Sequence, residues 1–128
     1  ASLRNAKVSP ANIDTILVTH LHADHVFGFP SFILERKYIS DRSGEKPLTI
    51  AGSKNVRQRL ELLCELAYPG SLDSMLSNIN WIDIPESDIW TFERFKVQHD
   101  PKSEPHGWMM THKNGWSILH SGDSGPCE

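Results

Sequence analysis

The sequence predicts a mixed α/β domain, and three patterns carry this prediction. A short apolar run rich in β-branched residues at 15–19 is typical of a strand buried on both faces, and 47–51 is predicted to form a second short strand. An amphipathic helix lies between residues 53 and 70. Residues 79–120 are strand-rich and contain an Asn-Gly turn signal. The element order is therefore α-β-α-β-α followed by several strands, which favours a layered α/β fold.

The composition fits one ordinary globular domain, residues 1–128. The chain is 38% hydrophobic and 23% charged with a net charge of −3, which argues against disorder. No run approaches the roughly 20 apolar residues that a membrane span requires. The slightly acidic balance gives no general attraction to nucleic acid or anionic lipid. Because two cysteines cannot form a disulfide scaffold, we expect a reducing, cytoplasmic compartment.

The first half of the chain alternates helices and strands. A helical stub at 2–6 precedes a single helical turn, for which we expect Ser9 to be the N-cap. After the first strand, a helix is expected over 29–38. The second strand leads to the clearest helix, with Ser53 as its expected N-cap and a stop at Pro69-Gly70. Its apolar stripe comprises Val56, Leu60, Leu63, Cys64 and Ala67, so Cys64 is expected to be a small buried hydrophobe.

The second half is expected to form strands. One strand is predicted at 79–84 and another at 89–97. The apolar phase slips between Phe92 and Phe95, which predicts a bulge or tight turn near Glu93-Arg94. The apolar runs 108–111 and 116–120 flank Asn114-Gly115, which predicts a hairpin.

Four potential metal ligands follow the first strand within six residues: His20, His22, Asp24 and His25. His20 and His22 alternate, so both project to one side of an extended segment. The consecutive Asp24 and His25 can face a second point a short distance away. Neutral imidazole and carboxylate suit zinc, iron or manganese. A polar turn with accidental histidines would place costly polar groups beside a core, so a metal site is the better interpretation.

The His20–His25 motif resembles the signature of the metallo-β-lactamase-fold hydrolases. The stretch 16–28 is similar to the ribonuclease Z-like branch, which includes tRNA 3′-processing endonucleases, and so is His-Ser-Gly-Asp-Ser at 120–124. Residues 46–71 are more similar to bacterial hydrolases of the same branch. The resemblance covers about residues 13–128 and implies a four-layer αβ/βα sandwich. The family's opening strands and its last His ligand have no counterpart here, so we expect a domain that is incomplete at both ends.

The resemblance also implies a role for each matching residue. It implies two divalent metal ions, most simply zinc, with manganese or iron as alternatives. Asp24 is the implied catalytic residue, because it can bind a metal and also orient or deprotonate the attacking water. The implied ligands are His20, His22 and His99 for the first metal, Asp24 and His25 for the second, and Asp123 as the bridge.

The function that the resemblance implies is hydrolysis of a phosphodiester by a metal-bridging hydroxide. Relatives act on cyclic nucleotides, sulfate esters and lactones, so a sulfatase or lactonase activity is an alternative. RNA is a weaker expectation, because the short interval from His99 to Asp123 leaves no room for a tRNA-clamping arm, although long-form enzymes carry that arm elsewhere. A further alternative is a truncated or non-catalytic metal-binding piece that assembles with another chain or as a homo-oligomer.

Three other histidines have competing interpretations. His106 is a candidate for the substrate pocket, with a structural or exposed loop role as the alternative. His112 lies in the predicted hairpin and is expected to be solvated. His120 shares a strand face with Trp116 and Ile118, so it is expected to be a core histidine with its hydrogen bonds satisfied rather than a ligand.

Overall fold

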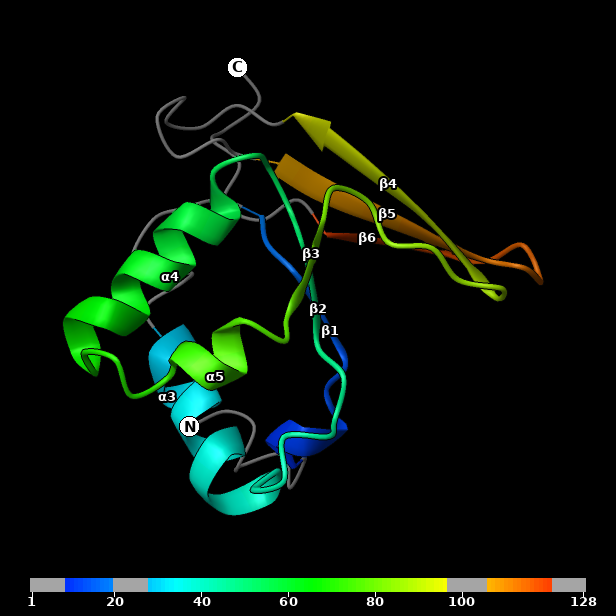
Figure 1. Cartoon of the computed structure of the whole chain (residues 1–128). Helices are drawn as coiled ribbons and strands as arrows, with labels where there is room; N and C mark the ends of the chain where they lie inside the picture. The colour runs from blue at the N-terminus through cyan, green and yellow to red at the C-terminus, as the bar shows by residue number, and fades with distance from the viewer. Residues whose placement is uncertain (1–8, 20–27, 97–105, 121–128) are drawn as a thin grey trace.

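The computed structural model describes residues 9–19, 28–96 and 106–120. This part of the chain contains two three-stranded sheets; the helices pack on one side of the first sheet, and the second sheet extends away from the helices (Figure 1). The predicted mixed α/β organisation is therefore confirmed. None of the helices in these three ranges has the length and apolar character that a membrane crossing needs.

The first sheet is parallel, with the strand order β1-β2-β3. Its strands are β1 (Thr15–Leu17), β2 (Thr49–Ala51) and β3 (Asn80–Ile82), and Ile16, Ile50 and Trp81 are aligned across it. Because the strands are parallel, their carboxyl ends lie at one edge. Strand β1 is only half-buried, with Thr15 exposed and Ile16 packed against the core, so the prediction that it is covered on both faces is wrong.

Within the described residues, the helical layer contains five elements. A 3₁₀ turn η1 (Pro10–Asn12) precedes β1, and α3 (Phe29–Glu35) continues into a π-helical turn η2 (Arg36–Ser40). The two later helices are α4 (Val56–Ala67) and α5 (Asp73–Leu76). The helix predicted at 29–38 therefore corresponds to one continuous run that ends two residues later.

The hydrophobic core lies between these helices and the first sheet. On α4, Val56, Leu60 and Cys64 are buried, so the predicted stripe is confirmed except at its last member, Ala67, which is exposed. Each fully buried aliphatic side chain of this kind contributes roughly 1.5–3 kcal/mol. The largest side chains that are fully buried in this core are Ile33, Ile50, Leu60, Leu72 and Cys64.

One predicted helix cap is confirmed and the other is wrong. Ser9 occupies the N-cap position of η1, with Pro10 as the first helical residue, although the Ser9 side chain makes no capping hydrogen bond. The N-cap of α4 is Asn55 rather than Ser53, and it also lacks a side-chain cap. Ser53 contributes its backbone carbonyl instead, which accepts the N–H of Val56 at 3.1 Å.

The second sheet is an antiparallel meander of β4 (Trp90–Lys96), β5 (His106–His112) and β6 (Ser117–His120). The predicted hairpin is confirmed, since the His112 N–H donates to the Trp116 carbonyl at 2.8 Å. Gly115 closes this turn with a φ of +100°, a backbone conformation that favours glycine.

The predicted bulge near Glu93-Arg94 is wrong. The register between β4 and β5 runs without interruption from Trp90 opposite His112 to Lys96 opposite His106. The apparent slip arises because Arg94 occupies an inward position of a regular strand, opposite Trp108. Phe95 then points to the other face, toward Gly107, where a Cβ would lie 2.4 Å from the Phe95 ring.

Candidate functional site

All six predicted metal ligands lie outside the described residues. These are His20, His22, Asp24, His25, His99 and Asp123. Within the described ranges, no group of three or more His, Cys, Asp or Glu side chains is arranged to hold a metal ion. The described residues that precede the three ligand-bearing segments, together with the residue that follows 97–105, therefore border the candidate site. We call these residues the attachment points: Thr19, Lys96, His106 and His120. Gly28, which follows the segment 20–27, is the N-cap of α3 and is not one of them.

The first attachment point follows the carboxyl end of β1. Just before it, the Val18 N–H donates to the Ala51 carbonyl at 2.8 Å, and the Val18 carbonyl accepts the indole N–H of Trp108 at 3.1 Å. Gly52 allows close packing here, since a Cβ on it would lie 3.2 Å from the Val18 Cβ. Val18 is thus hydrogen-bonded to both sheets just before the His20–His25 segment begins. It lies at the carboxyl end of a parallel strand, where α/β proteins commonly bind ligands.

The other attachment points lie together at one end of the second sheet. Lys96 is paired with His106, and Trp108 is paired with His120. Lys96, His106 and His120 therefore lie at the same end of this sheet. Figure 1 shows that β4 ends on the same side of the molecule as the carboxyl ends of the parallel strands. The bond from Trp108 to Val18 joins this end to the first attachment point.

A contact between the two sheets reinforces this arrangement. Arg94 on β4 pairs with Asp83, which directly follows β3, at 2.5 Å between Nη2 and Oδ1, and its Nη1 also donates to the Asp83 carbonyl at 3.2 Å. The Arg94 guanidinium lies 5.9 Å from the ring centroid of Trp108. The Arg94 side chain is 16% exposed and the Asp83 side chain 69% exposed, so the pair is shielded from solvent on the Arg94 side only. The ends of β1 and β3 are both joined to the second sheet.

Sequence reasoning missed Trp108, Arg94 and Asp83. The signal for Arg94 was present, because a charged residue stood at an inward position where the apolar alternation seemed to break. Nothing in the sequence indicated that the Trp108 indole would reach a carbonyl 90 positions earlier.

Two of the three histidines of the second sheet, His112 and His120, differ from expectation. His106 begins strand β5, and its side chain lies outside the described part of the molecule, so its role in a substrate pocket stays a prediction. His120 is exposed, so the prediction of a core histidine is wrong: all four residues of β6 are exposed, since this strand forms an edge of the described sheet.

His112 is half-buried in an aromatic cluster, so the prediction that it is solvated is also wrong. Its ring stacks on Trp116, with centroids 5.0 Å apart and planes at 12°, and meets Trp90 edge-on at 5.0 Å. Its Nδ1 accepts the backbone N–H of Asn114 at 3.1 Å, which assigns the proton of the neutral ring to Nε2. This cluster stabilises the hairpin at the end of the sheet opposite the attachment points.

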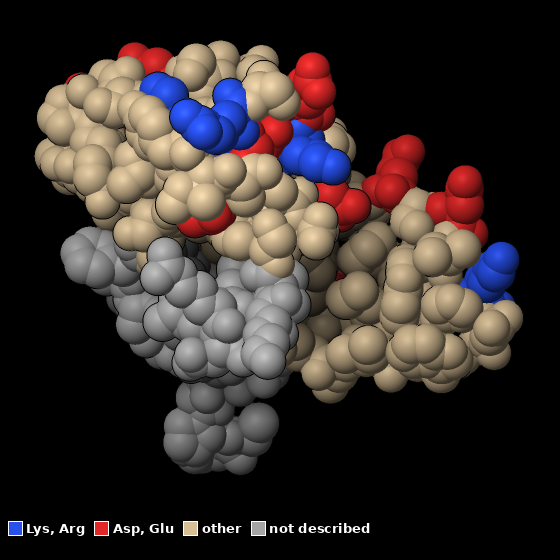
Figure 2. All heavy atoms as spheres, turned by 90° about the horizontal axis from the view of Figure 1, so that it is seen from below, with Lys and Arg blue, Asp and Glu red and all other residues tan. Residues whose placement is uncertain are grey.

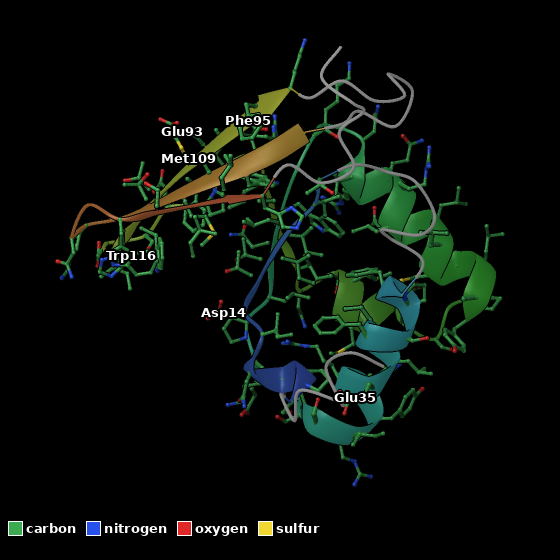
Figure 3. The ribbon with its side chains drawn as sticks, turned by 180° about the vertical axis from the view of Figure 1, so that it is seen from behind. Asp14, Glu35, Glu93, Phe95, Met109 and Trp116 are labelled. Atoms are coloured by element: carbon green, nitrogen blue, oxygen red, sulfur yellow. The ribbon has the colours of Figure 1, made fainter. Side chains whose placement is uncertain are left out.

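A groove of about 580 Å³ separates the two sheets near this hairpin. It is lined by residues that precede or begin the parallel strands, including Asp14 and Thr49, and by Trp90 and Met110 of the second sheet. Figure 3 shows Asp14 beside the start of β1 and Trp116 at the hairpin, whereas Phe95 lies toward the other end of the sheet. The groove is therefore distinct from the region of the attachment points.

Cys64 has the buried, inert character that the sequence predicts. It is 1% exposed, and burial, together with the nearby Glu61 carboxylate, raises the pKa of its thiol to about 11. A neutral thiol is a poor nucleophile and metal ligand, so Cys64 belongs to the core rather than to a reactive site.

Comparisons with known proteins place the chain in a family. The sequence model of the anti-Pycsar protein Apyc1 family matches residues 1–125. The ribonuclease Z of Geobacillus kaustophilus is 38% identical over 90 residues, which cover 70% of this chain and 27% of that protein. The ribonuclease Z of Ligilactobacillus salivarius is 30% identical over 116 residues, which cover 86% of this chain and 34% of that protein.

These relatives confirm the predicted resemblance over much of the chain. A third ribonuclease Z, from Leuconostoc mesenteroides, is 32% identical over 97 residues, or 72% of this chain. The chain spans about a quarter to a third of the length of these relatives. The mixed α/β fold, with helices on one parallel sheet and a second sheet beside it, agrees with them. The chain belongs to the anti-Pycsar protein Apyc1 family, in the ribonuclease Z-like branch of the metallo-β-lactamase fold.

Proposed function

We propose that this protein is a dimetal hydrolase of phosphodiesters. The observation that carries the proposal is the hydrogen bond from the Trp108 indole to the Val18 carbonyl. Through it and the strand register, the attachment points of all three ligand-bearing segments lie in one region of the fold. Segments that are far apart in sequence can therefore contribute side chains to one site.

The donor set of these segments fits two divalent ions. Four imidazoles and two carboxylates are the ligands that zinc prefers, and manganese and iron accept them as well. In this proposal three histidines would hold one ion, an aspartate and a histidine would hold the other, and a second aspartate would serve both. The assignments are His20, His22 and His99, then Asp24 and His25, and finally Asp123. Such a pair of ions polarises a phosphoryl oxygen and lowers the pKa of water.

The chain's own contribution is to orient and deprotonate the nucleophile. Asp24 is the proposed general base, since its carboxylate can accept a proton from the attacking water. The strand ends before and after the ligand segments are fixed by hydrogen bonds and by the Asp83–Arg94 pair. A framework of this kind reduces the reorganisation that the site needs during reaction.

A small phosphodiester is the substrate class that the described surface favours. The relatives are named ribonuclease Z, which supports phosphodiester chemistry. The β5–β6 hairpin occupies most of the interval between His99 and Asp123, where a tRNA-clamping arm was not expected to fit. On the face shown in Figure 2, basic side chains gather on the larger part of the molecule with acidic side chains among them, and acidic side chains predominate toward the narrower part, so no basic track crosses this face. A cyclic nucleotide is therefore a better first substrate than precursor tRNA.

Metal content and turnover test this proposal together. We expect about two bound zinc equivalents and hydrolysis of bis(p-nitrophenyl) phosphate and of a 3′,5′-cyclic nucleotide. Asp24→Ala should lower turnover by roughly 10²–10⁴-fold, the usual contribution of a general base. Asp88→Ala, which removes an exposed carboxylate, is the matched control and should leave turnover unchanged.

Three results would contradict the proposal in different ways. Undiminished turnover in Asp24→Ala would remove the proposed role of that residue. If the protein hydrolysed sulfate esters or lactones but no phosphodiester, the proposed phosphodiester substrate class would be wrong. One metal equivalent or none, together with a dimer in solution, would favour a non-catalytic assembly module.

A further inference from the structure

We propose that Trp108 is a positioning residue for the metal site, acting through the Val18 carbonyl. This inference rests on the proposed function, because it concerns the segment that carries His20 to His25. In the sequence, Trp108 lies far from the His20–His25 segment. The structure shows that its indole hydrogen-bonds to Val18, just before that segment.

The hydrogen bond lies in a protected environment. Trp108 is 2% exposed and Val18 is 9% exposed, and the indole nitrogen lies 3.1 Å from the carbonyl oxygen. Beyond the last aligned pair of β1 and β2, Leu17 and Ala51, the regular register ends. A buried carbonyl at such a strand end needs a donor, and leaving it without one costs about 1–3 kcal/mol. The Trp108 N–H meets this need.

The donor itself is held in place. Strand β5 lies between β4 and β6, so its backbone is paired on both sides. The Arg94 guanidinium covers the Trp108 ring and is fixed in turn by Asp83. The missing side chain at Gly107 admits the Phe95 ring on the opposite face. Trp108 therefore has little freedom to follow a shift of the β1 end.

The consequence concerns the direction in which the chain leaves β1. The Val18 carbonyl belongs to the peptide group that joins Val18 to Thr19, and His20 is the next residue. Fixing this peptide plane restricts the direction in which the first proposed ligand emerges. Outer contacts that orient metal ligands typically change metal affinity 10–100-fold. Because Trp108 acts through the backbone, we expect an effect near the lower end, about tenfold.

The test replaces the indole N–H and measures metal binding rather than activity alone. Trp108→Phe keeps an aromatic ring and removes the donor. The matched control is Trp81→Phe, because within the described part of the chain the buried Trp81 indole nitrogen has no hydrogen-bond acceptor. The readouts are the zinc Kd from chelator competition, the absorption spectrum of the cobalt-substituted protein, and amide hydrogen exchange of residues 15–19 in metal-free protein.

We expect Trp108→Phe to weaken zinc binding about tenfold, alter the cobalt spectrum and speed exchange at 15–19, while Trp81→Phe leaves all three unchanged. If Trp108→Phe does not fold, replacing Trp108 by 3-benzothienylalanine removes the N–H and retains the shape. An unchanged Kd and spectrum in either folded variant would overturn the positioning role and leave the proposed function intact. A parent protein that binds no metal would overturn both.

Discussion

Arg36 offers a sharp test of how the helical layer is joined to the parallel sheet. Its guanidinium is 1% exposed and donates to four backbone carbonyls. The acceptors are Pro10 and Ile13 before β1, at 3.0 and 2.7 Å, and Lys46 and Pro47 before β2, at 2.8 and 3.3 Å. Arg36→Met keeps much of the aliphatic stem and removes every one of these donors.

The expected loss in the free energy of unfolding follows from the number of acceptor groups that lose Arg36 as their partner. Asp41 lies 3.9 Å from the guanidinium and loses its charge partner, although it still accepts the N–H groups of Glu45 and Lys46. Breaking a buried charged network of this kind costs about 3–5 kcal/mol, less than the sum of its hydrogen bonds because water reaches some of the exposed acceptors. For a domain whose total stability is about 5–15 kcal/mol, this loss is large.

Urea unfolding followed by circular dichroism measures the effect. The control is Arg57→Met, because Arg57 pairs with Glu61 at 3.2 Å on the α4 surface and is 60% exposed. The control should change the free energy of unfolding by no more than about 0.5 kcal/mol. If Arg36→Met lost no more stability than Arg57→Met, the structural role derived for the buried guanidinium would be refuted.

Three further predictions concern packing and titration. Leu60→Ala on α4 should lower the free energy of unfolding by about 2–5 kcal/mol, whereas Leu66→Ala, at a position 71% exposed, should change it by less than about 0.5 kcal/mol in the same urea assay. Gly107→Ala should cost about 1–3 kcal/mol, since the added Cβ would lie 2.4 Å from an aromatic carbon of β4 and 3.0 Å from a backbone oxygen; an unchanged melting temperature would contradict this. Burial raises the pKa of Cys64 from 9.0 to about 11, so in a Cys127→Ser background the stability that the neutral thiol contributes should be present below pH 9 and be lost as pH rises from 9 to about 11. Urea midpoints compared with those of Cys64→Ala over that range should show this loss in the parent only, and equal slopes would contradict it.

Local sequence patterns correctly predicted α4 and the β5–β6 hairpin, whose conformations depend mainly on neighbouring residues. The Val56, Leu60 and Cys64 stripe predicted which face of α4 is buried, because helical periodicity determines that face. Asn114-Gly115 predicted the hairpin, because Gly115 supplies the positive φ that the turn requires.

The errors came from features of the tertiary structure that the local pattern did not identify. The slip between Phe92 and Phe95 suggested a bulge, but Arg94 occupies an inward position of a regular strand and pairs with Asp83, which follows β3. His120 seemed to belong to a core face, yet β6 is exposed along its length.

The ligand set was predicted from its spacing and from the family resemblance, and it stays a prediction, since its residues lie outside the described ranges. What the structure adds is the position of the attachment points. The bond from Trp108 to Val18 could not be predicted, because it depends on how two sheets pack rather than on either strand.

The zinc stoichiometry of the protein and of Asp123→Ala tests the central claim most directly. Asp123 is the proposed bridge, so its loss should affect both ions, whereas His112→Ala removes a histidine that the aromatic cluster occupies and serves as the control. We predict two zinc equivalents in the parent and in His112→Ala, and at most one in Asp123→Ala. A parent with fewer than two equivalents, or Asp123→Ala that retains two, would contradict the dimetal site.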